Sequence, residues 1–425
     1  MTSTVKNRGR ISGIRLRAAS TALASLLALV ATPWAQAQTY RVLYNFSGGT
    51  SDGEEPYSGV VRDAKGNSYG TTALGGANGF GTVFKLSATG KETVLYSFRG
   101  GTDGAYPYAG LVRDKLGNLY GTTTGGGQAD NGTVFKLVLG SNGKWTETVL
   151  HRFAGYSTGD GSVPTAALIL HAGNLYGTTN KGGIPKSGPP NNGTVYKLSP
   201  GSNGKWTETV LYSFSLEGGD GFNPYAGLVL DGAGNLYGTT TDGGSDDSGT
   251  VFKLDTAGLE TVLHSFAGTG GDGATPYAGL VFDAAGNLYG TTSAGGGASG
   301  LGTVFKIDTN GTETVLHEFT GGDGASPYAG LIFDAGGNLY GTTTSGGASN
   351  DGTVFKLAPG SNSIWTESVL HSFAGNPKDD GGSPFAGLFR DAMGNLYGTT
   401  EAGGKYGCCK GVVFQIQSTR SPTVP

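Results

Sequence analysis

The sequence predicts an all-β fold, a seven-bladed β-propeller of four-stranded blades, and three observations support this prediction. A short core motif, Asn-Leu-Tyr-Gly-Thr-Thr, returns seven times along the 425 residues. Each copy lies among four strand-like runs within about 50 residues, which is the size of a propeller blade. The two ends of the array are complementary fractions of one blade. The copies begin at Asn67 (where Ser68 replaces Leu), Asn118, Asn174, Asn235, Asn287, Asn338 and Asn395.

The four runs are clearest in the copy that follows Pro276. We name them strands A, B, C and D, at residues 277–283, 287–292, 302–307 and 313–319. They are rich in Val, Thr, Tyr and Phe, which favour strands, and Gly, Asn or Asp bound each run. The 81 Gly therefore indicate turns at fixed offsets rather than disorder. A parallel β-helix is the second interpretation, but its coils are usually much shorter.

The ends of the array predict a closed ring. Residues 40–46 form a lone D-like strand, and the last repeat supplies only strands A, B and C, ending at residues 412–416. Pairing these ends completes one blade and leaves no exposed edge between them. We therefore expect a propeller over residues 38–417, in which residues 38–47 supply the outer strand of the seventh blade.

Residues 1–37 have the pattern of a secretory signal peptide. Five Lys and Arg precede a largely apolar run from Ala18 to Val30, and Ala35-Gln36-Ala37 matches an A-x-A cleavage site. A transmembrane anchor would need a longer span of about 20 apolar residues. We expect cleavage after Ala37, a secreted or periplasmic protein with no membrane span after cleavage, and a disordered tail at residues 418–425.

Charge and cysteine content exclude several classes of function. Loss of the five basic residues leaves 23 of the 28 Lys and Arg against 32 Asp and Glu, a net charge of −9. Such an acidic chain has no electrostatic reason to bind nucleic acid or anionic lipid. Cys408 and Cys409 are the only cysteines, so neither a disulfide framework nor a zinc site is expected. They form either a strained vicinal disulfide or two free thiols, and we expect a monomer with no metal and no cofactor.

Two sets of aspartates recur in predicted turns. In the D–A connection an Asp-Gly pair precedes a Pro by four residues in every repeat, and seven such carboxylates on one face could bind a cation or a sugar. An Asp that accepts backbone N–H groups within its own turn is the stronger interpretation. These candidate ligand-binding residues are Asp52, Asp103, Asp160, Asp220, Asp272, Asp323 and Asp380. The A–B turn carries the second set, too sparse for a calcium loop: Asp63, Asp114, Asp231, Asp283, Asp334 and Asp391.

Strands C and D carry a second pair of recurring charges. Strand C has Lys at one position and strand D has Glu at one position, as in Lys306 and Glu313, and we expect each pair to lie opposite one another across the hairpin. The seventh blade has Gln415 and Tyr40 instead, so both partners change together. This correlated change supports pairing of the two chain ends.

Aromatic residues and histidines at repeat positions indicate packing rather than catalysis. One position of strand D alternates between His and Tyr, which suggests an amphipathic packing role and not a base or a ligand. Its occupants are Tyr44, Tyr96, His151, Tyr212, His264, His317 and His371. Trp145, Trp206 and Trp365 follow longer C–D turns, and we expect them to pack across their own strand pair. No catalytic residues are expected, since no His-Glu-x-x-His or P-loop pattern occurs.

The repeat resembles a known family. Asn-Leu-Tyr-Gly-Thr-Thr, Gly-Thr-Val-Phe-Lys-Leu and Thr-Val-Leu-His-Ser-Phe follow one another in tandem, and over residues 40–416 they resemble the GloVer tandem repeats of choice-of-anchor bacterial surface proteins. The resemblance implies an exported bacterial repeat protein without an established activity, and it brings no catalytic residues. The chain departs from the family at residues 417–425, which are short and polar, so the resemblance fits a free rather than an anchored form.

We expect a binding or interaction scaffold that uses one loop face of the propeller for an unknown protein or glycan. The D–A and B–C connections of a propeller share a face, and the B–C loops vary most between the copies. Two alternatives stay open: a secreted carbohydrate-active enzyme, either a hydrolase or a lyase, and a structural component of the cell envelope. An enzyme should break the repeat symmetry with carboxylates or His unique to one or two blades and converging on the axis, and the sequence shows no evident set of this kind.

Overall fold

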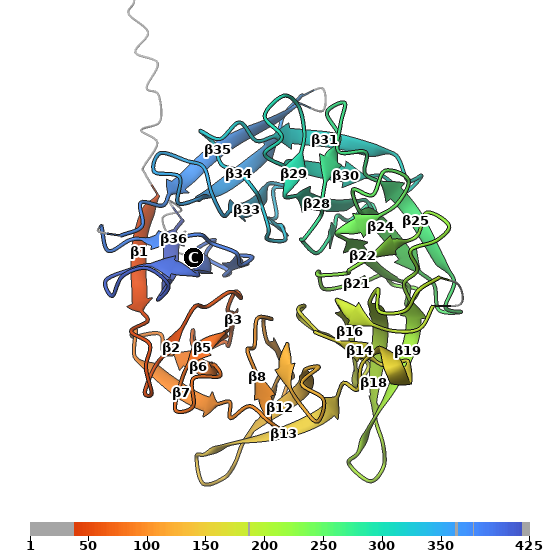
Figure 1. Ribbon diagram of the computed structural model, residues 1–425. Helices are drawn as coiled ribbons and strands as arrows, with labels where there is room; N and C mark the ends of the chain where they lie inside the picture. Colours follow the sequence, from red (N-terminus) through yellow and green to blue (C-terminus); the bar gives the residue numbers. More distant parts are fainter. Residues whose placement is uncertain (1–37, 186–187, 362–363, 377, 419–425) are drawn as a thin grey trace, which may run out of the picture. The chain divides into compact units, whose positions relative to one another are not determined.

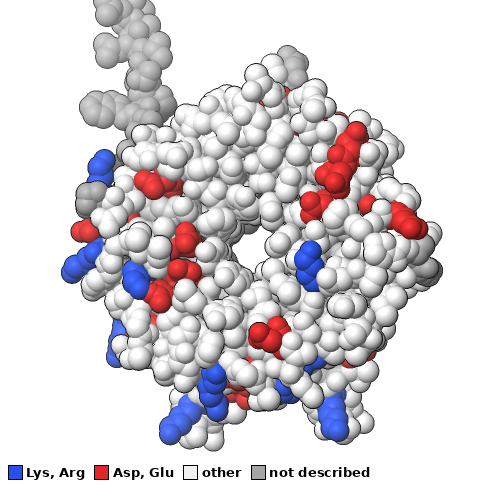
Figure 2. Space-filling model, in the orientation of Figure 1, with Lys and Arg blue, Asp and Glu red and all other residues white. Residues whose placement is uncertain are grey.

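The computed structural model shows seven four-stranded antiparallel sheets arranged in a ring around a central opening (Figure 1, Figure 2). It describes residues 38–185, 188–361, 364–376 and 378–418. The predicted fold is confirmed, and a short 3₁₀ turn lies at Tyr156–Thr158. The predicted signal peptide and all but the first residue of the predicted tail lie outside the described residues. None of the helices in the described ranges is long and apolar enough to cross a membrane.

Six blades are continuous in sequence, and each has its strands in the order A, B, C, D. Blade one contains β3 (Val61–Arg62), β4 (Ser68–Thr72), β6 (Thr82–Leu86) and β7 (Glu92–Ser97). Blade two contains β9 (Val112–Arg113), β10 (Leu119–Thr123), β12 (Thr133–Leu139) and β13 (Trp145–Arg152). Blade three contains β15 (Ile169–His171), β16 (Asn174–Thr179), β18 (Thr194–Pro200) and β19 (Trp206–Ser213). Blade four contains β21 (Val229–Leu230), β22 (Leu236–Thr240), β24 (Thr250–Leu254) and β25 (Glu260–Ser265).

Blades five to seven continue the pattern. Blade five contains β27 (Val281–Phe282), β28 (Leu288–Thr292), β30 (Thr303–Ile307) and β31 (Glu313–Glu318). Blade six contains β32 (Ile332–Phe333), β33 (Leu339–Thr343), β34 (Thr353–Pro359) and β35 (Trp365–Ser372). Blade seven contains β37 (Phe389–Arg390), β38 (Leu396–Thr400), β40 (Val412–Gln417) and β1 (Thr39–Asn45).

Small two-stranded sheets join the D–A connections to the B–C connections. They pair β2 (Gly53–Glu54) with β5 (Leu74–Gly75), β8 (Gly104–Ala105) with β11 (Gly125–Gly126), β14 (Gly161–Ser162) with β17 (Lys181–Gly182), β20 (Gly221–Phe222) with β23 (Asp242–Gly243), β26 (Gly273–Ala274) with β29 (Ala294–Gly295), and β36 (Gly381–Gly382) with β39 (Ala402–Gly403). In blade six a single bridge between Ala325 and Ser345 replaces this sheet.

The two ends of the array close the ring as predicted. Strand β1 pairs antiparallel with β40, with Tyr40 opposite Ile416 and Asn45 opposite Val412. Figure 1 shows β1, in red, at the outer edge of the blue seventh blade. Closure by the chain's own ends removes the unpaired sheet edge that an open array would expose.

Strand A is much shorter than predicted. In blade five the sequence predicted residues 277–283, but only Val281–Phe282 pairs with strand B. The residues before this strand leave their own sheet and contact the neighbouring blade, where Thr239 Oγ1 donates to the Ala278 carbonyl at 3.0 Å. The predicted strand is therefore in large part a connection that runs towards the axis.

The hydrophobic core lies between blades rather than within one blade. Phe266, directly after strand D of blade four, meets Phe305 of strand C in blade five edge to face, with centroids 5.1 Å apart. Both side chains are fully buried among Leu280, Leu288 and Ile307. Burying a Phe side chain contributes about 1.5–3 kcal/mol, so seven such interfaces stabilise the ring. The closing blade uses the same contact, between Phe46 and Phe84.

The first half of the core motif fixes the A–B turn. Asp283 Oδ1 accepts the N–H groups of Ala285 and Asn287, each at 2.9 Å. Its Oδ2 accepts the Asn287 side-chain amide at 2.6 Å and the Tyr289 hydroxyl at 3.1 Å. The recurring Asn and Tyr are therefore the partners of the turn aspartate, as the turn interpretation requires.

The second half of the motif packs the blade. A Cβ on Gly290 would lie 2.6 Å from the strand C aromatic ring, so no larger residue fits. Thr291 Oγ1 donates at 3.2 Å to an alanine carbonyl of the next blade, and the buried Thr292 Oγ1 lies 2.8 Å from Thr303 Oγ1. The motif is thus fully occupied by structural contacts.

The expected pairing of strand C Lys with strand D Glu is wrong. In blade one Lys85 lies opposite Thr93, whereas Glu92 lies opposite Leu86. Neighbouring residues of a strand point to opposite faces, so this offset of one residue separates the two charges. Lys85 instead lies opposite Tyr69 of strand B. The joint change at Gln415 and Tyr40 consequently reflects two separate sites, not one lost pair.

The three recurring tryptophans join blades. Trp145 lies 6.5 Å from Tyr69 of the preceding blade, between ring centroids. Trp206 and Trp365 make the equivalent contacts with Tyr120 and Tyr289 of their preceding blades. The expected packing of each tryptophan across its own strand pair therefore leaves out this contact with the preceding blade.

Candidate binding site at the central opening

The seven candidate aspartates are held singly, each inside its own D–A turn. Asp52 Oδ2 accepts the Ser47 N–H and Oδ1 accepts the Gly53 N–H, both at 2.7 Å. The alternating Tyr or His of strand D contacts the same carboxylate, as Tyr44 does at 3.0 Å. Each aspartate therefore binds the outermost strand of its own blade, and the structure does not gather the seven into one site. Their role in ligand binding stays a prediction.

The residue before each recurring proline has a left-handed backbone. Its φ lies between 52° and 59° in all seven blades, and it is 57° at Glu55. Residues other than Gly rarely adopt this conformation, and such residues cluster at functional sites. The carbonyl of Glu55 accepts the N–H of Ala73, and the carbonyl of Ser383 accepts the N–H of Glu401. This bond fastens the D–A connection to the residue that follows strand B.

We call these two bonded residues of each blade the rim positions. Their backbone is the same in every blade, but their side chains differ. The pairs are Glu55 with Ala73, Tyr106 with Thr124, Val163 with Asn180, Asn223 with Thr241, Thr275 with Ser293, Ser326 with Thr344, and Ser383 with Glu401. A fixed backbone with variable side chains is the usual arrangement of a binding surface.

An arc of aromatic residues follows the prolines, and we call it the aromatic crown. The ring centroids of its consecutive members lie between 4.7 and 5.3 Å apart. Its members, in order around the axis, are Tyr108, Tyr57, Phe385, Tyr328, Tyr277 and Tyr225. Blade three interrupts the arc with Thr165, whose Oγ1 donates to the Tyr225 carbonyl at 3.1 Å. Tyr108 is 37% exposed, so the end of the arc beside this gap is open to solvent.

A collar of small residues lies two positions further along the chain and brings the blades together at the axis. A Cβ on Gly279 would lie 3.2 Å from the Gly227 carbonyl oxygen, and one on Gly59 would lie 2.5 Å from that of Gly387. Only Gly permits such close backbone approach, and Ala167 of blade three is the single exception around the ring. Backbone, not side chains, therefore surrounds the opening behind the aromatic crown.

Two carboxylates break the symmetry of the rim. Glu55 of blade one and Glu401 of blade seven are the only acidic residues at rim positions. The Tyr57 hydroxyl donates to Glu401 Oε1 at 3.4 Å. Burial, and then the charge of Glu401, raises the pKa of Glu55, while burial raises the pKa of Glu401. The two carboxyl groups therefore lie within electrostatic reach of one another beside the aromatic crown.

At blades three and four, an asparagine side chain links a lysine to an aspartate, so the two charges offset one another. Lys181 Nζ donates to Asn223 Oδ1 at 3.0 Å, and Asn223 Nδ2 donates to Asp242 Oδ2 at 2.9 Å. Figure 2 shows acidic and basic side chains near the edge of the central opening and further charges of both signs towards the outer edge of the ring. The charge around the opening is thus uneven, in contrast to the regular fold.

Cys408 and Cys409 are separate, exposed thiols in the B–C connection of blade seven. A hydrogen bond with Cys408, followed by burial and charges that include Glu401 and Glu55, raises the pKa of Cys409. The thiols therefore lie near the acidic part of the rim. A vicinal disulfide between them stays a prediction.

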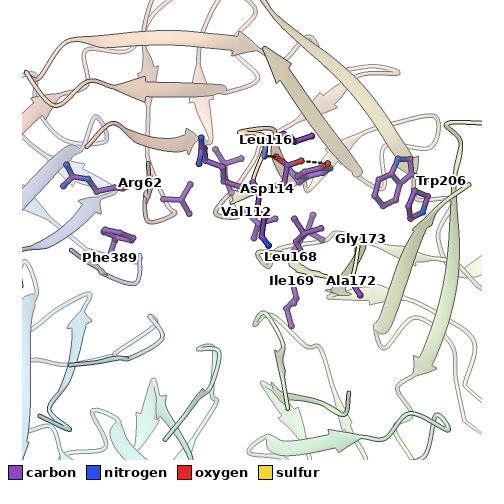
Figure 3. Close-up of a pocket in the computed structure, with 17 residues that line it drawn as sticks. Arg62, Val112, Asp114, Leu116, Leu168, Ile169, Ala172, Gly173, Trp206 and Phe389 are labelled. Atoms are coloured by element: carbon purple, nitrogen blue, oxygen red, sulfur yellow. Dashed lines mark hydrogen bonds between the residues drawn. The ribbon is translucent and has the colours of Figure 1, made fainter. Parts of the chain in front are cut away.

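The opposite face has a hollow of about 1090 Å³. Figure 3 shows Arg62 and Phe389 at one side of it and Trp206 at the other. The A–B turns of blades two and three contribute Leu116, which is 88% exposed, and Ala172. This hollow consists mainly of inner strands and turns and has no group of carboxylates comparable to the rim.

The sequence alone did not reveal the aromatic crown or the acidic rim pair. Glu55 and Glu401 lie at opposite ends of the chain and next to invariant-looking turn residues. Aligning the seven repeats position by position would have found them, because Tyr, Val, Asn, Thr or Ser occupies the place of Glu55 elsewhere, and Ala, Thr, Asn or Ser that of Glu401.

Among solved structures, the chain is similar to several propellers at low sequence identity. An ancestral GH74 enzyme is 13% identical with a TM-score of 0.56, over 88% of this chain and 49% of that one. A protein described as the extracellular domain of a one-component system from B. thetaiotaomicron is 11% identical with a TM-score of 0.52, over 87% and 40%. A gluconolactonase from Xanthomonas campestris is 12% identical with a TM-score of 0.41, over 89% of each chain. At these identities the likeness shows the fold alone.

Comparison with curated proteins gives no match. The family model described as the Gloeobacter/Verrucomicrobia repeat matches residues 30–190 and 184–414. Those two matches cover nearly all of the ring, in agreement with the repeat motifs. The chain belongs to the Gloeobacter/Verrucomicrobia repeat family.

Proposed function

We propose that the protein is an exported scaffold that binds a glycan at the aromatic crown and rim. The observation that supports this most directly is the arc of six aromatic rings around the opening, interrupted at Thr165. Tyrosine presents an apolar ring with a polar tip, which suits the mixed apolar and hydroxylated faces of a sugar. Secretion or periplasmic location belongs to this proposal and rests on the predicted signal peptide.

The rim supplies the polar groups that a sugar needs. Glu55 and Glu401 offer acceptors for hydroxyl groups at blades seven and one, and Lys181 with Asp242 offers both signs of charge at blades three and four. Binding sites of this kind combine a mostly aromatic lining with a few placed polar groups. A ligand that spans the opening would contact both polar sectors.

A carbohydrate-active enzyme is the second candidate, and one observation favours it. The acidic rim pair is a set of carboxylates unique to two adjacent blades, which is the departure from symmetry expected of an enzyme. Glycoside hydrolases use two carboxyl groups, one of them a general acid with a raised pKa. The raised pKa values of Glu55 and Glu401 fit that requirement.

A glycan array with residues 38–425 tests the proposal, followed by measurement of Kd for each glycan bound. Tyr277→Thr is the matched variant, because Thr165 already occupies the equivalent position in blade three. Loss of one ring should weaken binding about 3- to 10-fold, equivalent to about 0.5–1.5 kcal/mol. Leu259→Ala, in an exposed C–D turn on the other face, is the control and should leave Kd unchanged.

Hydrolysis or lyase assays on the bound glycans separate the two candidates. If the protein cleaves a bound glycan, and Glu55→Gln or Glu401→Gln abolishes this cleavage, the protein is an enzyme rather than a scaffold. A sugar site at the aromatic crown would be contradicted if no glycan on the array bound the protein, or if Tyr277→Thr left the Kd unchanged.

A further inference from the structure

One blade interface differs from the other six in its polar groups. His151 lies on β13 of blade two, Asp160 in the D–A connection that follows, and Glu208 on the outer strand β19 of blade three. One ligand atom from each of these side chains lies within 4.8 Å of the others. His151 Nε2 and Asp160 Oδ2 are 3.2 Å apart, and the two side chains are only 19% and 12% exposed.

Two buried oxygens at this interface have no hydrogen-bond partner. One is Glu208 Oε1, and the strand D glutamates of five other blades share this property. The other is the hydroxyl of Tyr196, a residue that is completely buried. Every other blade has Phe at the position of Tyr196, so blade three alone places a hydroxyl there. Burial, and then the charges of Glu208 and Asp160, raises the pKa of Tyr196, which puts the hydroxyl within electrostatic reach of both carboxylates.

Neither carboxylate has a Lys or Arg partner in the part of the chain that the structure describes. Within residues 38–185, 188–361, 364–376 and 378–418, no Lys or Arg forms an ion pair with Asp160 or Glu208. Two anions that are half-buried side by side require compensation by a cation or a proton. The imidazole of His151 offers a nitrogen ligand atom beside the two carboxylates.

We propose that His151, Asp160 and Glu208 form a binding site for a divalent transition-metal ion that joins blades two and three. One imidazole nitrogen and two carboxylate oxygens form a donor set that suits Zn²⁺, and three protein ligands leave a position for water. Ligand atoms around tetrahedral zinc are about 3.4 Å apart, so the His–Asp pair is already at the right separation and Glu208 closes on binding. The proposal departs from the expectation of no metal, which rested on the two neighbouring cysteines and on the alternation of His and Tyr in strand D.

The chain itself contains the matched comparison sites. His264 with Asp272 and Glu313, and His317 with Asp323 and Glu367, repeat the residue types at two further interfaces. Among the described residues, only the set at blades two and three gathers three ligand atoms within 4.8 Å. Three other interfaces use Tyr in place of His, as Tyr96 does with Asp103 at 2.9 Å. His151→Tyr therefore removes the nitrogen ligand while keeping a side chain that this fold already accepts.

The test uses residues 38–425, without an affinity tag and stripped of metal with a chelator. Calorimetric titration with Zn²⁺ and visible spectroscopy with Co²⁺ should show one site. His151→Tyr should weaken Zn²⁺ binding about tenfold or more. Glu208→Gln should do the same without disturbing the fold, since it removes a charge from a crowded pair. His317→Tyr, the control at another interface, should leave the affinity unchanged.

Absence of Zn²⁺ and Co²⁺ binding would overturn the proposal, as would an affinity that His151→Tyr and Glu208→Gln both leave unchanged. Equal weakening by His317→Tyr would also refute a site peculiar to blades two and three. Repeating the titration with Cys408→Ser/Cys409→Ser shows whether the thiols bind the metal, and loss of all binding in that variant would contradict the assignment.

Discussion

The ring of Tyr40 lies flat on the imidazole of His371, with centroids 3.8 Å apart and planes 2° from parallel. Tyr40 belongs to β1, the first strand of the ring, and His371 to β35 of blade six. Tyr40 occupies the place of the Glu that the other six blades carry, and its ring also meets Phe373 edge to face. At the interface between blades six and seven, stacked rings thus occupy the place that a carboxylate occupies at the other six interfaces.

Removal of residues 38–47 should strongly destabilise the protein. Blade seven would lose its outer strand, β40 would become an exposed edge, and the stacking on His371 would disappear. We expect a fall in Tm of more than about 10 °C, or loss of the cooperative transition, measured by calorimetry on residues 48–425 against residues 38–425. Arg41→Ala, an exposed position of the same strand, should change Tm little. An unchanged Tm of the truncated protein would contradict closure by β1.

Phe266→Ala should cost about 3–5 kcal/mol of unfolding free energy. The side chain is 0% exposed and fills the interface between blades four and five, so truncation leaves a cavity that rigid blades cannot close. Urea denaturation followed by tryptophan fluorescence gives the value. Leu259→Ala, at a side chain that is 65% exposed, is expected to stay within about 0.5 kcal/mol. Equal losses for the two variants would show that the core does not lie between the blades.

Stability should fall as the pH rises from about 5 to about 8. Burial, and then the charge of a neighbouring aspartate, raises the pKa of Glu92, Glu147 and Glu260 from 4.5 to about 7. A raised pKa in the folded state means that the stabilising contribution is complete below the unfolded value of 4.5 and is lost as pH rises through 7. Tm measured across this range should therefore decline.

Glu92→Gln/Glu147→Gln/Glu260→Gln should flatten that decline and raise Tm at pH 8. The three interfaces pair their aspartate with Tyr, not His, so no imidazole titrates in them. Glu217→Gln changes an exposed glutamate and serves as the control. A pH profile that the triple variant leaves as steep as the wild type would refute the assignment.

Glu401→Gln should lower the pKa of Glu55. The charge of Glu401 is the second cause, after burial, of the raised pKa of Glu55, and the substitution removes it. Carboxyl ¹³C chemical shifts followed against pH measure the change, with Glu217→Gln as a distant control. If the titration of Glu55 does not move, the two rim carboxylates do not act on one another.

The sequence predicted the blades and their closure because both depend on short-range pattern. The turn at Asp283, the glycine at Gly290 and the complementary ends each leave a local signature. The register of Lys85 and Glu92 was predicted wrongly, because the C–D turn sets it: Leu86 and Glu92 are the pair next to the turn, so Lys85 lies opposite Thr93. The recurrence of one Lys and one Glu in each repeat does not record which residues the turn places opposite one another.

The candidate site was missed for a different reason. The aromatic crown residues follow prolines in a segment that was predicted to be strand A, so their approach to one another at the axis was not evident. Glu55 and Glu401 meet only once the ring has closed. Their proximity joins residues that are far apart in the sequence, so only a position-by-position alignment of the repeats, combined with ring closure, would have brought the two together.

The composite seventh blade also determines the order in which the blades can form during synthesis. Strand β1 is synthesised before blades one to six and its partner β40 after them, so β1 has no sheet to join until the rest of the ring has left the ribosome. Blades one to six can form from contiguous sequence while synthesis continues, whereas the seventh waits for its last strand. Until then both ends of the growing arc present open edges, and a chain cut short near its end would retain them permanently.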